Sequence, residues 1–176
     1  MGALRRSHVS IGLAVAAAFA LGLLLPAAFG RTASPATAVR SALAQSDGVR
    51  GAPGRTMVLS RVVVPPGVRL ALHHHLGTQI SRVVAGTLTY TVRRGSAVVH
   101  SGEADDHPRL VRRIGAGQTA RIHPGQWLVE QPSDIHEAAN RGSTPVVIYL
   151  ATLLKTGAPP ATPVTLPLAR HGAGPG

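Results

Sequence analysis

The sequence predicts an all-β domain, built as a double-sheet jelly roll or a barrel and preceded by an N-terminal signal segment. Short extended runs follow one another between residues 56 and 155, and the 20 glycines and 14 prolines of the chain suit the turns between them. Aromatic residues make up only 3% of the chain, so the core must be built from Val, Leu, Ile and Ala. No convincing helix and no internal repeat follows the signal segment.

Residues 1–44 have the features of an export signal. A pair of arginines gives a positive start, and residues 9–25 form an uncharged run rich in Ala and Leu. Small residues at 36–38 and 42–44 offer two cleavage sites. We expect a cleaved signal and a secreted or extracytoplasmic protein. Two alternatives stay open: membrane anchoring through an uncleaved residue 9–25 segment, which lies at the lower limit of a membrane span, and twin-arginine export.

A linker is expected over residues 45–55, where Ser, Gly, Ala and Pro are frequent. The barrel follows over residues 56–155, and residues 156–176, rich in Pro, Gly and Ala, are expected to form a loosely attached tail. Trp127 is expected either in the core of the barrel, which we favour, or in the lining of the pocket.

The clearest strand covers residues 87–92. Leu88, Tyr90 and Val92 alternate there with threonines, so the three share one face. Residues 145–154 form a nearly continuous apolar strand that closes the barrel. Further strands are expected at 56–64, 68–75, 79–84, 97–100, 110–114, 118–123 and 127–130, with a polar loop at 103–108.

A run of three histidines is the most informative feature of the chain. His73 and His75 are two residues apart, so on an extended strand both imidazoles project from one face, and His74 faces away. Gln79 follows beyond a Leu-Gly-Thr corner. Two imidazoles and a nearby oxygen donor form much of a coordination shell for a divalent transition metal. The alternatives are a polar surface patch without metal and a purification-tag fragment, although a tag would lie at a terminus and run longer.

This run resembles the first motif of the cupin superfamily, and the chain is similar to small single-domain, quercetinase-like cupin 2 proteins. Gly67, His73, His75 and Gly86 fall at the spacings of that motif, and Gln79 stands where cupins usually carry glutamate. The likeness covers residues 56 to 155 and implies the double-stranded β-helix, or jelly-roll, barrel of cupins.

The second cupin motif is matched more loosely. Its final histidine and asparagine are present at the family spacing as His136 and Asn140, and Gly125 begins the motif. Pro132 is one residue late, and Asp134 occupies the place of the second glycine.

The resemblance implies one divalent transition metal ion inside the barrel, held by His73, His75, Gln79 and His136. Fe, Mn, Ni, Cu or Zn suits such a site, and thiolate ligation is excluded because the chain has no cysteine. An amide in place of a carboxylate leaves the site more positive, so it should hold metal less firmly and favour anionic ligands. Glu130 either orients a ligand near the pocket or lies at a solvated edge. His100 and His123 are expected at surface or turn positions.

Two functions are compatible with these observations. The first is an exported metal-dependent oxygenase of the dioxygenase kind, or an isomerase, acting on a small oxygenated organic molecule. The alternative is a non-catalytic extracytoplasmic module that binds metal or a small ligand. The histidine set favours the enzyme, whereas the missing glutamate and the degenerate second motif favour the binding module.

The net charge of +11 does not indicate a nucleic-acid partner. The arginines are scattered over turns and strand ends, without a basic helix or an aromatic stacking platform. The expected partner is therefore a small molecule. The cupin resemblance also makes a homodimer through outer strands an expectation.

Overall fold

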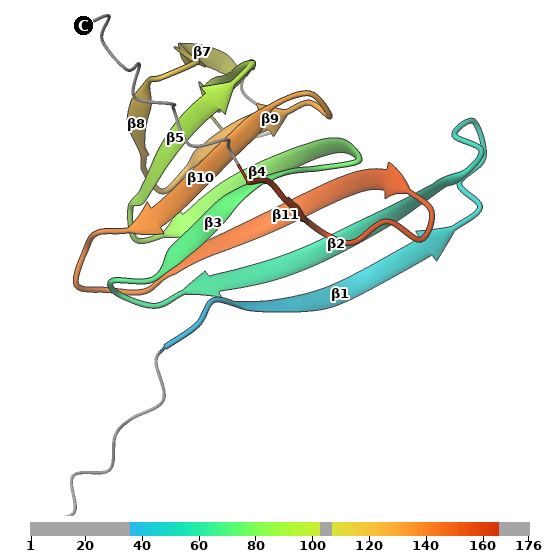
Figure 1. The fold of residues 1–176 in the computed structure, drawn as a ribbon, viewed down its shortest axis with the longest axis horizontal. Coiled ribbons are helices and arrows are strands. Elements are labelled where there is room, and N and C mark those ends of the chain that lie inside the picture. Colours follow the sequence, from blue (N-terminus) through green and yellow to red (C-terminus); the bar gives the residue numbers. More distant parts are fainter. Residues whose placement is uncertain (1–35, 103–106, 166–176) are drawn as a thin grey trace, which may run out of the picture. The chain divides into compact units, whose positions relative to one another are not determined.

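A computed structural model describes residues 36–102 and 107–165, which form twelve strands in two antiparallel sheets (Figure 1). The predicted all-β class is confirmed. Within the described residues, no helix is long and apolar enough to cross a membrane. The expected signal segment at residues 9–25, most of the polar loop at 103–108 and the end of the tail lie outside the described residues.

The larger sheet has seven strands in the order β1-β2-β11-β4-β9-β6-β7. Every neighbouring pair in it is antiparallel, and β11 lies between two strands that are distant from it in sequence. Its strands are β1 (Val39–Asp47), β2 (Arg55–Val64), β4 (Gly77–Ala85), β6 (Ser96–Ser101), β7 (Arg109–Gly115), β9 (Gln126–Glu130) and β11 (Val146–Lys155).

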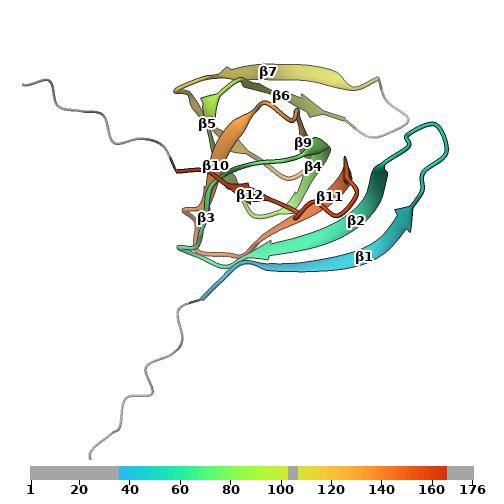
Figure 2. The same cartoon turned by 45° about the vertical axis from the view of Figure 1, so that its right-hand side comes forward.

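The smaller sheet has five strands in the order β12-β3-β10-β5-β8. Figure 2 shows β3, β10 and β5 on one side of the barrel, facing strands of the larger sheet on the other. Its strands are β3 (Arg69–His74), β5 (Leu88–Arg94), β8 (Thr119–Ile122), β10 (Ile135–Asn140) and β12 (Thr162–Pro163).

The hydrophobic core lies between the two sheets. On β5 the side chains of Leu88, Tyr90 and Val92 are buried, as their alternation predicts. On β11 the residues facing inward, among them Ile148 and Leu150, are buried in the same cluster. Each such side chain stabilises the fold by about 1.5–3 kcal/mol relative to an exposed one. Both sheets therefore contribute one apolar face to a common core.

Three glycines of the two sequence motifs have backbone conformations that other residues rarely adopt. Gly67, Gly86 and Gly125 have φ angles of 76°, 70° and 84°. At Gly86 a Cβ atom would also lie 2.6 Å from the carbonyl oxygen of Pro145. Each glycine lies in a turn or bend just before a strand, which explains its place in the motifs.

Strand β1 lies where the sequence predicts signal and linker. It pairs with β2 from Val39, opposite Val63, to Asp47, opposite Thr56. All of its residues are exposed, because β1 is the edge of the sheet. An exposed edge strand needs no alternation of apolar and polar residues, so the sequence carries no strand signal there. The predicted linker at 45–55 is wrong at residues 45–47, and the sheet begins before the predicted boundary at residue 56.

Two other strands lie outside the predicted set. Strand β10 is buried on both faces and carries His, Glu and Asn, so its composition resembles a loop more than a strand. Strand β12 pairs with β3 at Thr162 and Pro163, inside the segment predicted as a loosely attached tail. That expectation is wrong for these residues, which complete the smaller sheet.

The sequence favours a core position for Trp127, but the structure places this residue half-buried on the other face of β9. Its neighbour Leu128 takes the inward position, and successive side chains on a strand point to opposite faces. The indole stacks on His100, with ring centroids 5.6 Å apart, and the guanidinium carbon of Arg82 lies 5.7 Å from the ring. His100 is therefore a half-buried packing residue, whereas His123 is exposed in a turn, as expected.

Candidate metal centre

Three histidines converge inside the barrel from two neighbouring strands. His73 lies on β3, and His75 is the first residue after the end of this strand. His136 on β10 is the Cα partner of His73. One ring nitrogen of each histidine lies within 4.8 Å of the others. The register of β10 shifts on both sides of His136, an irregularity of the kind that re-aims a side chain. His74 does not line the pocket, in agreement with strand alternation.

Backbone carbonyls orient two of the imidazole rings. Nδ1 of His73 lies 2.6 Å from the carbonyl oxygen of Ala71, and Nδ1 of His75 lies 2.8 Å from that of Pro160. Because a carbonyl only accepts, each Nδ1 donates its N–H, and Nε2 of the neutral ring keeps its lone pair. Histidine ligands of metals are commonly held in this way.

All three histidines are neutral near pH 7. Burial lowers the pKa of His73, His75 and His136, and this effect outweighs the attraction of the nearby Glu130 carboxylate. Neutral imidazoles offer the lone pairs that a metal ion needs.

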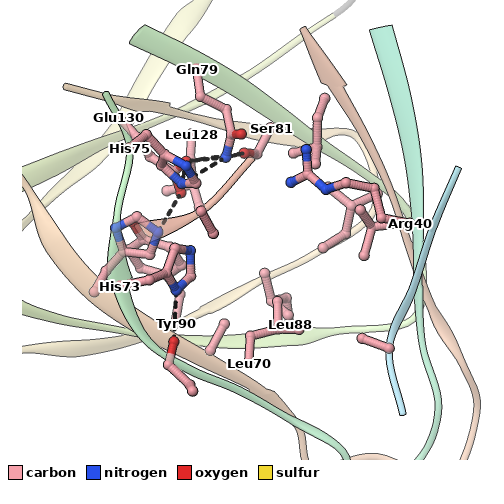
Figure 3. A pocket seen from close by; sticks show the side chains of 18 of the residues that line it. Arg40, Leu70, His73, His75, Gln79, Ser81, Leu88, Tyr90, Leu128 and Glu130 are labelled. Carbon is pink, nitrogen blue, oxygen red and sulfur yellow. Dashed lines mark hydrogen bonds and ion pairs between the residues drawn. The ribbon is translucent and has the colours of Figure 1, made fainter. Parts of the chain in front are cut away.

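Glu130 is the carboxylate of this cluster. It lies on β9 directly opposite Gln79 on β4, and only 3% of it is exposed, so the solvated-edge alternative is wrong. Its Oε2 lies 3.6 Å from Nε2 of His75, and its Oε1 lies 3.6 Å from Nε2 of His136. Figure 3 shows Glu130, His75 and Gln79 gathered at one end of the pocket. The acid that the first motif lacks is thus present, on the neighbouring strand.

The Glu130 carboxyl is ionised. Burial raises its pKa, but the nearby His136 and His75 and a hydrogen bond from Gln79 lower the pKa by a larger amount, so that it lies below the usual value. The same burial and the Glu130 charge raise the pKa of Tyr90, whose phenol therefore stays protonated.

The side-chain amide of Gln79 is directed by Glu130. Its Nε2 donates to Glu130 Oε2 at 2.5 Å and to Ser81 Oγ at 3.1 Å, and it lies 3.3 Å from Nε2 of His75. Its Oε1 is buried and has no hydrogen-bond partner among the described residues. Gln79 therefore stands beside the histidines, with its nitrogen rather than its oxygen toward His75 and the carboxylate.

The remaining polar residues of the second motif support the fold around His136. Asp134 accepts hydrogen bonds from the backbone N–H groups of Gln131, at 2.8 Å, and Ser96, at 3.1 Å. It thereby fixes the turn before β10, in the place where the motif has a glycine. Asn140 donates to the carbonyls of Val64 and Thr144 at 2.9 and 2.8 Å, which anchors the other end of β10.

The histidines form one wall of a cavity of about 310 Å³. The other walls are largely apolar and come from both sheets, with Leu70, Leu88 and Ile148 among them. Arg40 of β1 also faces this cavity, across from the histidines (Figure 3), and makes no ion pair with any described residue. Arg40 is exposed as a whole residue, but partial desolvation of its guanidinium at the cavity lowers its pKa, and an arginine side chain nevertheless keeps its charge in proteins.

Sequence reasoning missed the contributions of Arg40 and Pro160 to this site and left that of Glu130 undecided. Glu130 meets Gln79 across a strand pairing that spans 51 residues, and Pro160 reaches His75 across 85 residues. No local pattern carries such a contact.

No family model matches this sequence, and no curated protein matches it. Solved structures similar to this chain include a cupin 2 domain-containing protein from Halorhodospira halophila. It shares 15% identity with a TM-score of 0.48, over 77% of this chain and 76% of the other.

An oxalate oxidase in complex with the substrate analogue glycolate shares 20% identity with a TM-score of 0.45, over 73% of this chain and 57% of the other. A DMSP lyase shares 14% identity with a TM-score of 0.45, over 62% of this chain. The chain spans 44% of that lyase, less than half of its length. Likenesses of this size indicate no particular activity.

Features of the chain itself agree with the resemblance found in the sequence. Two antiparallel sheets enclose a pocket, and the histidines of both sequence motifs meet inside it. The fold, the two motifs and this histidine cluster together resemble those of the cupin superfamily.

Proposed function

We propose that this protein binds one divalent transition metal ion through His73, His75 and His136 and presents it to a small oxygenated organic molecule. The observation that carries the proposal is the convergence of three neutral imidazoles in a buried pocket. Imidazole nitrogen suits Fe, Mn, Ni, Cu and Zn alike, so the donor set fits the group without selecting the element. Within the described part of the chain, Gln79 Oε1 and His136 Nδ1 are buried without a hydrogen-bond partner, so both atoms are available for contacts with a bound group.

A bound metal ion would supply Lewis acidity to substrate oxygens and, for Fe, Mn or Cu, a redox centre. The chain's own residues supply the rest of the site. The apolar walls exclude water, Glu130 offers a carboxylate next to the histidines, and Tyr90 keeps a protonated phenol there. The carboxylate can accept a proton and the phenol can donate one, which supports an oxygenase or isomerase as the first candidate.

The ligand we propose is a small organic anion. Arg40 faces the cavity, and its guanidinium matches a carboxylate in geometry and charge. The apolar walls between Arg40 and the histidines suit the hydrocarbon part of such a molecule. Exchange of Arg40 for Ala should weaken the binding of a carboxylate ligand more than that of its neutral amide.

A non-catalytic binding module is the second candidate. The observation that favours it is Gln79, because an amide at that position cannot accept a substrate proton as a carboxylate can. In either case we propose that the protein acts outside the cytoplasm, in agreement with the sequence of residues 1–44.

The metal content of tag-free protein tests the proposal. About one equivalent of a transition metal is expected in the parent and none in the His73→Ala, His136→Ala double variant. His74→Ala is the matched control, because it removes an imidazole from the same strand outside the pocket, and it should keep the metal. A parent without metal after reconstitution would overturn the proposal. Oxygen uptake with phenolic and diketone substrates then separates an oxygenase from a binding module, which consumes none.

A further inference from the structure

We propose that Glu130 supplies the carboxylate ligand of this metal centre, and that Gln79 holds this carboxylate instead of binding the metal. The cupin resemblance places the acidic ligand at position 79, on β4. Here it comes from the directly opposite position on β9. The inference rests on the proposed metal-binding function and concerns which side chains complete the trihistidine set.

The distances between Glu130 and the histidines are those of ligands that share an ion. Both carboxylate oxygens lie 3.6 Å from an imidazole Nε2, which is too long for a hydrogen bond. Metal bonds of about 2.0–2.1 Å in a tetrahedral site separate neighbouring ligand atoms by about 3.4 Å. These two carboxylate–imidazole contacts therefore have nearly the spacing of neighbouring ligands in a coordination shell.

The facing atoms of His75 and Glu130 are both hydrogen-bond acceptors. Nδ1 of His75 donates to the carbonyl of Pro160, so its Nε2 carries a lone pair. The carboxylate Oε2 opposite it accepts from the amide of Gln79 and from Ser81 Oγ, and the same amide nitrogen lies 3.3 Å from Nε2 of His75. A cation between the two buried acceptors would stabilise both of them, because acceptors that face each other in a buried site repel.

Gln79 is not oriented as a ligand. Its amide nitrogen, which has no lone pair for a metal, points to Glu130 Oε2 at 2.5 Å. A rotation of the amide by 180° would place Oε1 against the carboxylate oxygen, acceptor against acceptor. While Glu130 is ionised, the amide is held in the observed orientation. Gln79 is therefore a positioning residue that restrains the carboxylate.

The charge of the site supports the same assignment. Three neutral imidazoles and an amide would leave a divalent ion with its full charge in a buried cavity, which is costly. The ionised Glu130 reduces the net charge to +1. This arrangement restores the charge balance of a trihistidine and carboxylate site.

Titration of tag-free protein with Co²⁺ tests the assignment, with the dissociation constant and the visible d–d spectrum as readouts. Glu130→Gln should weaken Co²⁺ binding at least about 100-fold, and Gln79→Ala about 10-fold, as for residues that support a ligand. Asp47→Asn is the matched control: it removes one negative charge on β1 and should leave the affinity unchanged. Glu130→Asp keeps the charge in a shorter side chain, and should both weaken binding and change the spectrum.

The outcomes separate this inference from the proposed function. If the parent binds no Co²⁺, the proposed metal-binding function itself fails. If the parent binds and Glu130→Gln binds equally well, the inference is overturned and the trihistidine site stands. A larger loss for Gln79→Ala than for Glu130→Gln would make Gln79 the ligand and would also overturn it. If Glu130→Gln does not fold, Glu130→Asp decides, and an unchanged affinity and spectrum would refute the assignment.

Discussion

The ring of Tyr90 stacks on the imidazole of His136, with centroids 5.0 Å apart and planes inclined by 24°. Both residues are buried, and they lie on the neighbouring strands β5 and β10. The stack holds the imidazole from the side of the core. Since the phenol oxygen of Tyr90 has no hydrogen-bond partner within residues 36–102 and 107–165, the ring and not the hydroxyl is expected to make the stabilising contact.

Replacement of Tyr90 separates these two parts. Tyr90→Ala leaves a cavity and removes the stack, and should lower the free energy of unfolding by about 3–5 kcal/mol. Tyr90→Phe keeps the ring and should change it by less than about 1 kcal/mol. Urea denaturation of the metal-free protein measures both values. Equal losses in the two variants would show that the hydroxyl, not the ring, stabilises the site.

The stability of the metal-free protein should fall on acidification. The pKa values of His73, His75 and His136 are lowered from 6.5 in the folded state, so the unfolded chain binds more protons as the pH falls below 6.5. The neutral histidines therefore contribute to the free energy of unfolding above pH 6.5, and this contribution is lost as the pH falls from 6.5 toward the pKa values of the folded state. The lowered pKa of Glu130 adds a further loss below its ordinary value of 4.5.

Urea midpoints measured at several pH values check this expectation. The His73→Ala, His136→Ala variant should show a flatter profile between pH 7.5 and 5.5, because two of the shifted groups are gone. Metal binding should weaken over the same range, since protons compete for the imidazole lone pairs. A parent midpoint that stays constant over this range would contradict the assigned pKa directions.

A carboxylate at position 79 of β4 should be able to replace the one at position 130 of β9, because the two positions lie directly opposite each other. In the Gln79→Glu, Glu130→Gln double variant, the acid and the amide exchange places on directly opposite residues. The amide can again donate to the acid, so we expect recovery of most of the Co²⁺ affinity lost in Glu130→Gln. Titration of both variants gives the comparison. A folded double variant without recovery would mean that position 79 lies beyond reach of the metal, contrary to the cupin resemblance.

Signal processing is expected after Ala38 and not after Ala44. The first cut leaves β1 whole, whereas the second removes residues 39–44 from the strand and takes Arg40 from the pocket. Mass spectrometry of the exported protein should therefore find Val39 at the N-terminus. A chain that begins at Gln45 would contradict this prediction, and a shortened chain made with that start should be less stable than one that begins at Val39.

The parts of the fold that the sequence predicts are those with a strong local signal. Strand β5 alternates Leu, Tyr and Val with Thr and Arg, and β11 is a long apolar run, so both are recognisable alone. Strand β1 is exposed along its length and β12 has two residues, and neither needs an apolar pattern. Strand β10 is buried on both faces, and the polar residues that it contributes to the site interrupt the apolar pattern by which a strand is recognised.

The candidate site divides in the same way. His73 and His75 are recognisable because two residues of separation place both on one face of a strand. The resemblance to a second motif adds His136. The part played by Glu130 depends on the pairing of β4 with β9, and that of Arg40 on the pairing of β1 with β2. Such pairings are set by the whole core, so no short window of sequence contains them.

The bond from His75 to Pro160 has a consequence for the order in which the protein matures. A growing chain presents its N-terminal part first, and 85 residues must be added after His75 before the carbonyl that sets its tautomer exists. A nascent chain can pair its early strands but has an incompletely oriented histidine. The proposed metal ion would therefore meet an oriented His75 only after residue 160 has been synthesised, and a chain truncated before residue 160 would lack the carbonyl that orients this ring.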